Sequence, residues 1–296
     1  MTDRFTVQSA RALPAGHARI STTTIADSIG IVGVRLDLGG ITTKRPIAAN
    51  CGATYSLRVL AARSLGRGGE AVEVRPMHPW DLSPKEAIRL QLELSSRLIL
   101  SWDGREVTSV GGVDVSVKNG RSRAAIVVLS FPDLEPIEGV TAEAEVVFPY
   151  VPGLLTVREG PVILAAWEKL ESHPDLLLFD GQGIAHPRGI GLAAHMGLWL
   201  DRPSLGVAKS RLYGVHEPPG SNRGDTADLL DESDVGRVIG SVLRTRTDVK
   251  PVFVSPGHRI DVKRASEFTL ACCTRYRLPE TTRWAHRVAG GARLPT

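Results

Sequence analysis

The 296-residue chain has few cysteines and few aromatic side chains. Its three cysteines, Cys51, Cys272 and Cys273, form no C-x-x-C pair, and two of them are adjacent in the chain. A disulfide framework and a cysteine-ligated zinc site are therefore not expected. Reduced thiols are typical of cytosolic proteins, so this cysteine usage favours a cytoplasmic protein.

Long apolar runs are also missing. No stretch approaches the roughly 18 to 20 apolar residues that a membrane helix needs, and the first residues contain no apolar segment of signal-peptide type. The G-x-S-x-G elbow of serine hydrolases and the G-x-x-x-x-G-K run of P-loop proteins do not occur. We expect a cytoplasmic, monomeric protein with no membrane association, outside both of those enzyme classes.

The net charge of +4 is unevenly distributed. Residues 1–76 hold ten of the 36 basic residues but only five of the 32 acidic ones, so the rest of the chain is close to neutral. Residues 237–296 carry twelve basic and four acidic residues. This C-terminal excess fits either a phosphate-binding surface or an ordinary solvated one, so charge alone does not establish nucleic-acid binding.

Residues 1–76 differ from the rest in having weak periodicity and a linker-like Gly-Arg-Gly-Gly stretch at 66–69. We expect them to be an extension, which is disordered, a small appended module, or translated from an upstream start codon, with Met77 as an alternative start. Regular patterning begins near Trp80. We expect a catalytic domain over 77–290 and a short tail over 291–296.

The patterned region predicts a mixed α/β fold. Ser83, Pro84 and Glu86 have the features of a helix start, followed by apolar residues at helical spacing, which predicts a helix over 84–100. Strands are expected over 107–117, 123–131 and 140–148 as an antiparallel meander. Alternating elements follow: helices over 160–171, 189–200, 234–244, 261–275 and 281–289, and strands over 175–180, 204–207 and 251–254, with residues 214–233 irregular. This order predicts a mixed sheet with helices on both faces.

Three carboxylates occupy separate elements of this scheme. Asp114 lies within a nearly apolar strand, Asp180 ends the apolar run 176–179, and Glu159 lies where a helix is expected to begin. Ligands bind at the carboxyl ends of strands in α/β sheets, and magnesium prefers carboxylate oxygens together with waters and phosphates. Taken singly, each acid is explained better by a structural role, as a helix cap at Glu159 or an ion-pair partner at Asp114.

Longer motifs surround these acids. They lie at 110–116 (VGGVDVS), 148–155 (FPYVPGLL) leading to Arg158-Glu159-Gly160, 180–188 (DGQGIAHPR), 203–209 (PSLGVAK) and 254–259 (VSPGHR), followed by 276–280 (YRLPE). In this order the series resembles the endonuclease V family, over about residues 80–290. Residues 1–76 have no counterpart in that pattern.

The resemblance implies a ribonuclease H-like fold and a nuclease that cuts nucleic acid near deaminated purines. It places the metal ligands at Asp114, Glu159 and Asp180, further catalytic residues at His186, Lys209 and His258, and the substrate-binding residues at Tyr150, Gly153, Leu155, Gly181 and Gly191. Tyr150 would fill the gap left by an extruded base, in keeping with how enzymes that act on a base take it out of the stack. Without the motif, Tyr150 is explained equally well as a half-buried aromatic in a turn, and Lys209 is explained better as a surface lysine.

We therefore expect a DNA repair endonuclease that uses Mg²⁺, with Mn²⁺ able to substitute. It would hydrolyse the second phosphodiester bond 3′ to deoxyinosine and leave 3′-hydroxyl and 5′-phosphate ends. Two alternatives stay open: the same chemistry on inosine-containing RNA, and a non-catalytic binder of structured nucleic acid. The glycine-rich segments would let the backbone approach a base or a phosphate closely.

Overall fold

The computed structural model describes residues 76–293, so the expectations for residues 1–75 and 294–296 lie outside the described residues. Helix α1 (Pro84–Ser95) begins as predicted: the Ser83 side chain accepts a hydrogen bond from the Glu86 backbone, and the Glu86 carboxylate accepts one from Ser83 N at 2.8 Å. This helix ends five residues before the predicted boundary. No helix within 76–293 has the length and apolar character needed to cross a membrane.

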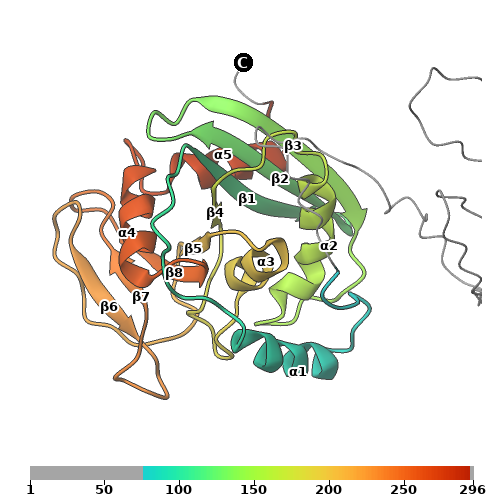
Figure 1. Ribbon diagram of the computed structural model, residues 1–296, viewed down its shortest axis with the longest axis horizontal. Coiled ribbons are helices and arrows are strands. Elements are labelled where there is room, and N and C mark those ends of the chain that lie inside the picture. Colours follow the sequence, from blue (N-terminus) through green and yellow to red (C-terminus); the bar gives the residue numbers. More distant parts are fainter. Residues whose placement is uncertain (1–75, 294–296) are drawn as a thin grey trace, which may run out of the picture. The chain divides into compact units, whose positions relative to one another are not determined.

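One eight-stranded mixed sheet forms the centre of the described region (Figure 1). Its spatial order is β3-β2-β1-β4-β5-β8-β7-β6. The strands are β1 (Ser109–Lys118), β2 (Arg121–Ser130), β3 (Pro136–Glu145), β4 (Leu176–Phe179), β5 (Ser204–Ala208), β6 (Thr226–Leu230), β7 (Val238–Leu243) and β8 (Val252–His258). The meander β1–β2–β3 is antiparallel, β1, β4 and β5 are parallel, and β8, β7 and β6 continue antiparallel.

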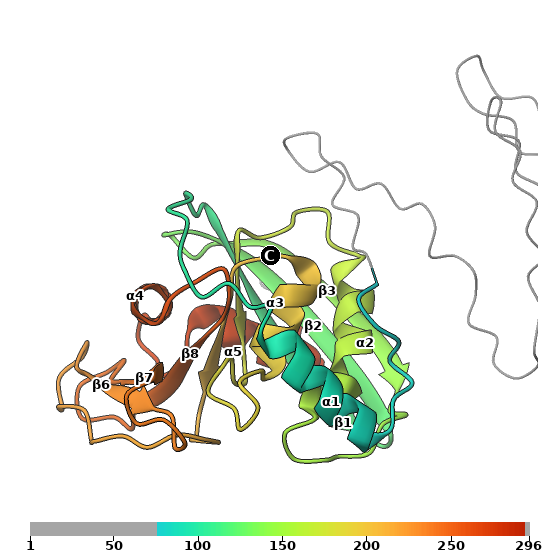
Figure 2. The same cartoon turned by 60° about the horizontal axis from the view of Figure 1, so that its bottom comes forward.

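Helices cover both faces of this sheet, as the sequence predicts (Figure 2). One core contains side chains of α4 (Val262–Ala271) and α5 (Glu280–Ala289), and the other contains side chains of α2 (Leu155–Trp167) and α3 (Leu192–Leu200). Strand residues alternate between them: Leu176 and Leu178 enter the first core, and Leu177 and Phe179 the second. Because successive strand side chains point to opposite faces, a strand covered on both sides is apolar throughout.

The prediction of a helix over 234–244 is wrong, since this segment contains strand β7, which pairs with β6 and β8. Its apolar residues Val235, Val238, Ile239 and Val242 have helical spacing by coincidence. Residues 239–243 are all buried, so the strand shows no alternation. The β-branched side chains fit a strand better than a helix. Its partner β6 lies in the stretch predicted to be irregular.

Helix α2 begins at Leu155, five residues before the predicted boundary, and contains Pro161 in its interior. Because proline has no backbone N–H, it cannot donate the usual hydrogen bond to the preceding turn. Glu159 therefore lies on the second turn of α2, after the start of the helix. Next to it, Gly160 packs directly against Trp80, whose ring would lie 2.3 Å from a Cβ added at Gly160. This contact fixes α2 to the segment that leads into α1.

Candidate metal and nucleic-acid site

Asp114 and Asp180 lie side by side on neighbouring parallel strands. Val113 of β1 is in register with Phe179 of β4, and Asp180 N donates to the Val113 carbonyl at 3.1 Å. Each acid therefore follows a paired residue whose side chain enters the core under α2 and α3. Alternation turns both carboxylates to the face covered by α5. Their side chains are 13% and 16% exposed, so both are largely shielded from water.

His286 of α5 completes a compact group with these two acids. Its Nδ1 lies 2.7 Å from Asp114 Oδ2, and one ligand atom from each of Asp114, Asp180 and His286 lies within 4.8 Å of the others. The close approach of α5 depends on Gly112, since a Cβ there would lie 2.1 Å from the Thr281 carbonyl oxygen. His286 is 172 residues from Asp114 and lies outside the motifs that predict the site, so no sequence signal singles it out.

Glu159 approaches from the opposite helix layer, on α2, and is 8% exposed. It is not a member of the compact group among residues 76–293. Burial, and then the charge of Asp114, raises its pKa to about 8, with Arg158 opposing this and Asp180 adding to it. Burial and Asp180 also raise the pKa of Asp114, while His286 lowers it. Three mutually repelling carboxylates with a nearby imidazole form a donor set suited to a divalent cation.

Lys209 lies beside Asp180, at the carboxyl end of strand β5. It follows the last residue of β5, and its ammonium group donates to Asp180 Oδ2. The lysine side chain is 44% exposed, so it extends from Asp180 toward solvent. The backbone of Lys209 is fixed by Arg277, whose Nη2 donates a hydrogen bond to the Lys209 carbonyl at 2.7 Å. A positive charge thus lies at the rim of the acidic group, where it could face an incoming phosphate.

Tyr150, Gly153 and His186 form a second region. Tyr150 is 69% exposed, with the Arg158 guanidinium 5.8 Å from its ring centre. His186 is buried, and both ring nitrogens are engaged: Nε2 donates to the Gly153 carbonyl at 3.0 Å, and Nδ1 accepts from Arg188 N at 3.2 Å. Burial, and then Arg188, lowers its pKa to about 4. Through both ring nitrogens this imidazole supports the Gly153 turn, and its catalytic role stays a prediction.

The remaining predicted substrate-binding residues border the same turns. Leu155 is the first residue of α2, and Gly191 is the N-cap of α3. A Cβ at Gly191 would lie 2.5 Å from the Gln182 carbonyl oxygen, so this glycine is needed for close backbone packing. At Gly181 a Cβ would meet only Leu192, at 3.7 Å, which leaves the space beside Gly181 open.

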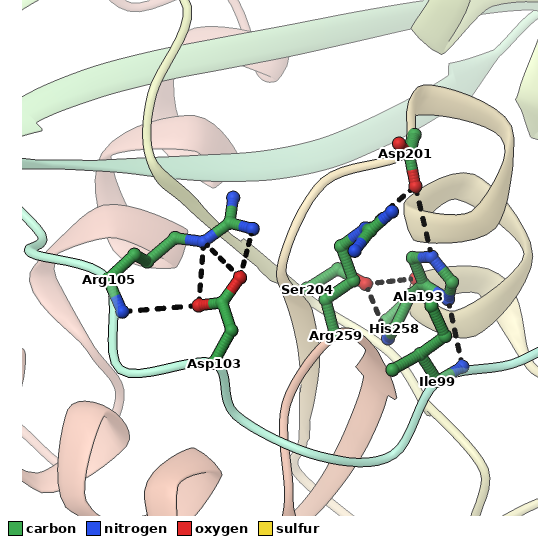
Figure 3. A network of polar contacts seen from close by, with 8 residues as sticks. All are labelled: Ile99, Asp103, Arg105, Ala193, Asp201, Ser204, His258 and Arg259. Carbon is green, nitrogen blue, oxygen red and sulfur yellow. Dashed lines mark hydrogen bonds and ion pairs between the residues drawn. The ribbon is translucent and has the colours of Figure 1, made fainter.

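His258 lies in a separate network of polar contacts with Ile99, Asp201 and Ser204 (Figure 3). His258 pairs with Ser204 at the amino end of β5, whereas Lys209 follows the carboxyl end, about 16 Å further along an extended strand. Its Nδ1 accepts from Ile99 N and its Nε2 donates to Asp201 Oδ1, both at 3.3 Å, and its side chain is 2% exposed. The expectation of a catalytic His258 is therefore not supported. This histidine links α3, β8 and the chain after α1.

Known proteins are similar to this chain in sequence and in fold. The sequence profile of the Endonuclease V family matches residues 92–287. An Endonuclease V of Methanothrix thermoacetophila is 50% identical over 212 residues, which cover 72% of this chain and 93% of that protein. The crystal structure of Endonuclease V from Streptomyces avermitilis is 44% identical and covers 73% of this chain and 96% of that one, with a TM-score of 0.68.

A Ciona intestinalis Endonuclease V, 26% identical, covers 70% of this chain and 95% of its own with a TM-score of 0.60. It was crystallised with a 24mer DNA containing an inosine followed by a ribo-adenosine. These likenesses confirm the expected ribonuclease H-like fold. The profile match spans well over half of the chain, and the relatives are covered almost completely. The chain therefore belongs to the endonuclease V family and is an endonuclease.

Proposed function

We propose that the chain is a metal-dependent DNA repair enzyme that cuts next to deoxyinosine. The observation that carries the proposal is the convergence of Asp114, Asp180 and His286 within 4.8 Å, with Lys209 bonded to Asp180. Asp114, Asp180 and Glu159 would hold Mg²⁺, or Mn²⁺ in its place, and His286 supplies a further nitrogen at the same position. When bound, such an ion polarises a phosphodiester and lowers the pKa of an attacking water.

The chain's own residues have separable tasks in this proposal. Lys209 offers a fixed positive charge to the non-bridging oxygens of the scissile phosphate. Burial and the charge of Asp114 raise the pKa of Glu159 to about 8, so binding of a cation would displace its proton into solvent. His286 orients Asp114 through its 2.7 Å contact. His186 holds the Gly153 turn and has no proton-transfer role in this scheme.

The proposed substrate is inferred from the region around Tyr150 and Gly153 and from the relatives. The exposed Tyr150 would enter the base stack, while Gly153, Leu155, Gly181 and Gly191 would line the space for the extruded base. Family membership and the inosine-containing complex of the Ciona protein support deoxyinosine as the lesion. Cleavage would fall at the second phosphodiester 3′ to it and leave 3′-hydroxyl and 5′-phosphate ends. Cys272 and Cys273 are buried free thiols, in keeping with a cytoplasmic enzyme.

Inosine-containing RNA is a second candidate substrate. The Ciona complex carries a ribo-adenosine directly after the inosine, which places a 2′-hydroxyl beside the expected cleavage position in that protein. A 2′-hydroxyl is the group by which proteins distinguish RNA from DNA. Matched DNA and RNA strands of one sequence therefore belong in the same experiment.

The deciding experiment is a strand-specific cleavage assay on duplexes with a single deoxyinosine or a single deoxyadenosine, with Mg²⁺ and with EDTA. We expect one nick in the deoxyinosine strand, only with metal, and a ligatable 5′-phosphate end. The Asp180→Asn variant should bind the duplex but not cut it. Cleavage of both duplexes at equal rates would refute the lesion preference, and full activity of Asp180→Asn would refute the metal site.

A further inference from the structure

Three side-chain donors converge on the carbonyl oxygen of Gly153. Gln91 Nε2 donates to it at 2.9 Å, His186 Nε2 at 3.0 Å and Arg188 Nη2 at 2.8 Å. A carbonyl oxygen has two lone pairs, so this acceptor is fully used. Gly153 itself has a φ of +78°, and a Cβ there would lie 2.5 Å from Arg188 Nη2. The side chains that hold this turn therefore leave no space for a side chain at position 153.

Gln91 is the least expected member of this group. It lies on α1, and it is a polar side chain with only 1% exposure. Its Nε2 also donates to the Ile190 carbonyl at 3.3 Å, and its Oε1 accepts from Arg188 Nε at 2.5 Å. Every polar atom of the carboxamide is thus bonded inside the protein. Buried polar groups that are fully bonded fix a unique local arrangement.

The two carbonyls that Gln91 joins belong to different segments. Gly153 lies between the exposed Tyr150 and the start of α2, which carries Glu159. Ile190 precedes Gly191, the N-cap of α3, and Gly191 N donates back to Gly183 at 2.7 Å. Under the proposed function, these are the two walls of the space that receives the extruded base. The buried carboxamide of Gln91 therefore connects the two walls through hydrogen bonds to Gly153 and Ile190.

We propose that Gln91, together with Arg188, is a positioning residue that sets the separation of these two walls and so determines selectivity for a deaminated purine. Gln91 cannot touch the base, since its side chain is buried and its polar atoms are occupied. It acts through Gly153 and Ile190. The inference rests on the proposed function, because it presumes that the base is held between these segments.

The test compares affinities for two duplexes that differ only in one deoxyinosine or one deoxyadenosine. Binding is measured by fluorescence anisotropy in Ca²⁺, under conditions where gels show no cleavage. Gln91→Met keeps the side-chain volume but removes both donors and the acceptor. We expect it to bind the undamaged duplex like the wild type, while its preference for deoxyinosine falls about tenfold, the effect of losing a buried hydrogen-bond network. Glu93→Gln, an exposed substitution on the same helix, should keep the preference.

A general loss of structure would weaken binding to both duplexes, whereas a change in wall separation alters their ratio. A folded Gln91→Met with unchanged preference would overturn the role of Gln91. If Gln91→Met does not fold by circular dichroism, the half-buried Arg188→Met decides by the same ratio, since it removes a Gly153 contact and the Gln91 contact. A wild type without any preference would instead overturn the proposed function, so the two failures are distinguishable.

Discussion

Replacing Glu159 with glutamine is expected to stabilise the metal-free protein at alkaline pH. The Glu159 side chain is 8% exposed and lies on α2 near two other acids. Burial and the charge of Asp114 raise its pKa from an ordinary 4.5 to about 8, against the opposing charge of Arg158. Above that pH the folded protein must bury a third carboxylate charge, which glutamine avoids.

The direction and size of this change in the free energy of unfolding follow from the number of protons that each state binds. An unfolded glutamate loses its proton near pH 4.5, but folded Glu159 keeps it to about pH 8. The folded state binds more protons between these values, so this stability is full below pH 4.5 and is lost as the pH rises through 8. At about 1.4 kcal/mol for each pH unit, the whole window corresponds to about 5 kcal/mol, of which about 2 kcal/mol falls between pH 6 and pH 8.

The measurement is urea unfolding in EDTA at pH 6 and pH 8. We expect the free energy of unfolding of the wild type to fall by about 2 kcal/mol more over this interval than that of Glu159→Gln. Glu168→Gln, at the exposed end of the same helix, should behave like the wild type. Saturating Mg²⁺ should restore the wild type at pH 8. An identical pH dependence in wild type and Glu159→Gln would refute the reasoning.

Three further substitutions test separate parts of the site. His286→Ala should weaken Mn²⁺ binding at least about tenfold in an electron paramagnetic resonance titration, because it removes a group 2.7 Å from Asp114 Oδ2; unchanged affinity would contradict its place at the site. Gly153→Ala should lower the free energy of unfolding by about 1–3 kcal/mol in urea, because of its positive φ and the crowding by Arg188; a variant of wild-type stability would argue against that crowding. His258→Ala should lower stability by about 1–3 kcal/mol but keep the cleavage rate constant, since it removes buried bonds far from Asp180. A large loss of rate in a folded His258→Ala protein would return this histidine to the catalytic group.

Local signals predicted much of the fold. The Ser83–Glu86 capping pattern located the start of α1, because both bonds form within one turn and depend on no distant residue. The fully apolar run 176–179 predicted a strand covered on both faces, and its alternate residues do enter two different cores. The ordered motifs around Asp114 and Asp180 predicted the family, since they preserve whole turns of backbone together with the acids.

Segments whose local preference is ambiguous could not be assigned from sequence. Residues 238–243 have apolar spacing that fits a helix, and only pairing with β6 and β8 makes them a strand. The sequence also did not predict the partners of two motif histidines. His258 lies at the far end of β5, and His186 uses both nitrogens to hold backbone. A loop motif shows that a histidine is present but not which atoms its ring meets.

By itself, the sequence determined the class of fold, the family and the two acids on neighbouring strands, because these depend on periodicity and on short runs of residues. Only the tertiary structure decided which groups join them. Gly112 allows α5 to pack against β1 and so delivers His286 to Asp114 across 172 residues. Gln91 likewise reaches Gly153 and Ile190 from a helix that contains none of the motif residues. Such contacts arise from packing between elements distant in the chain, and no local pattern encodes them.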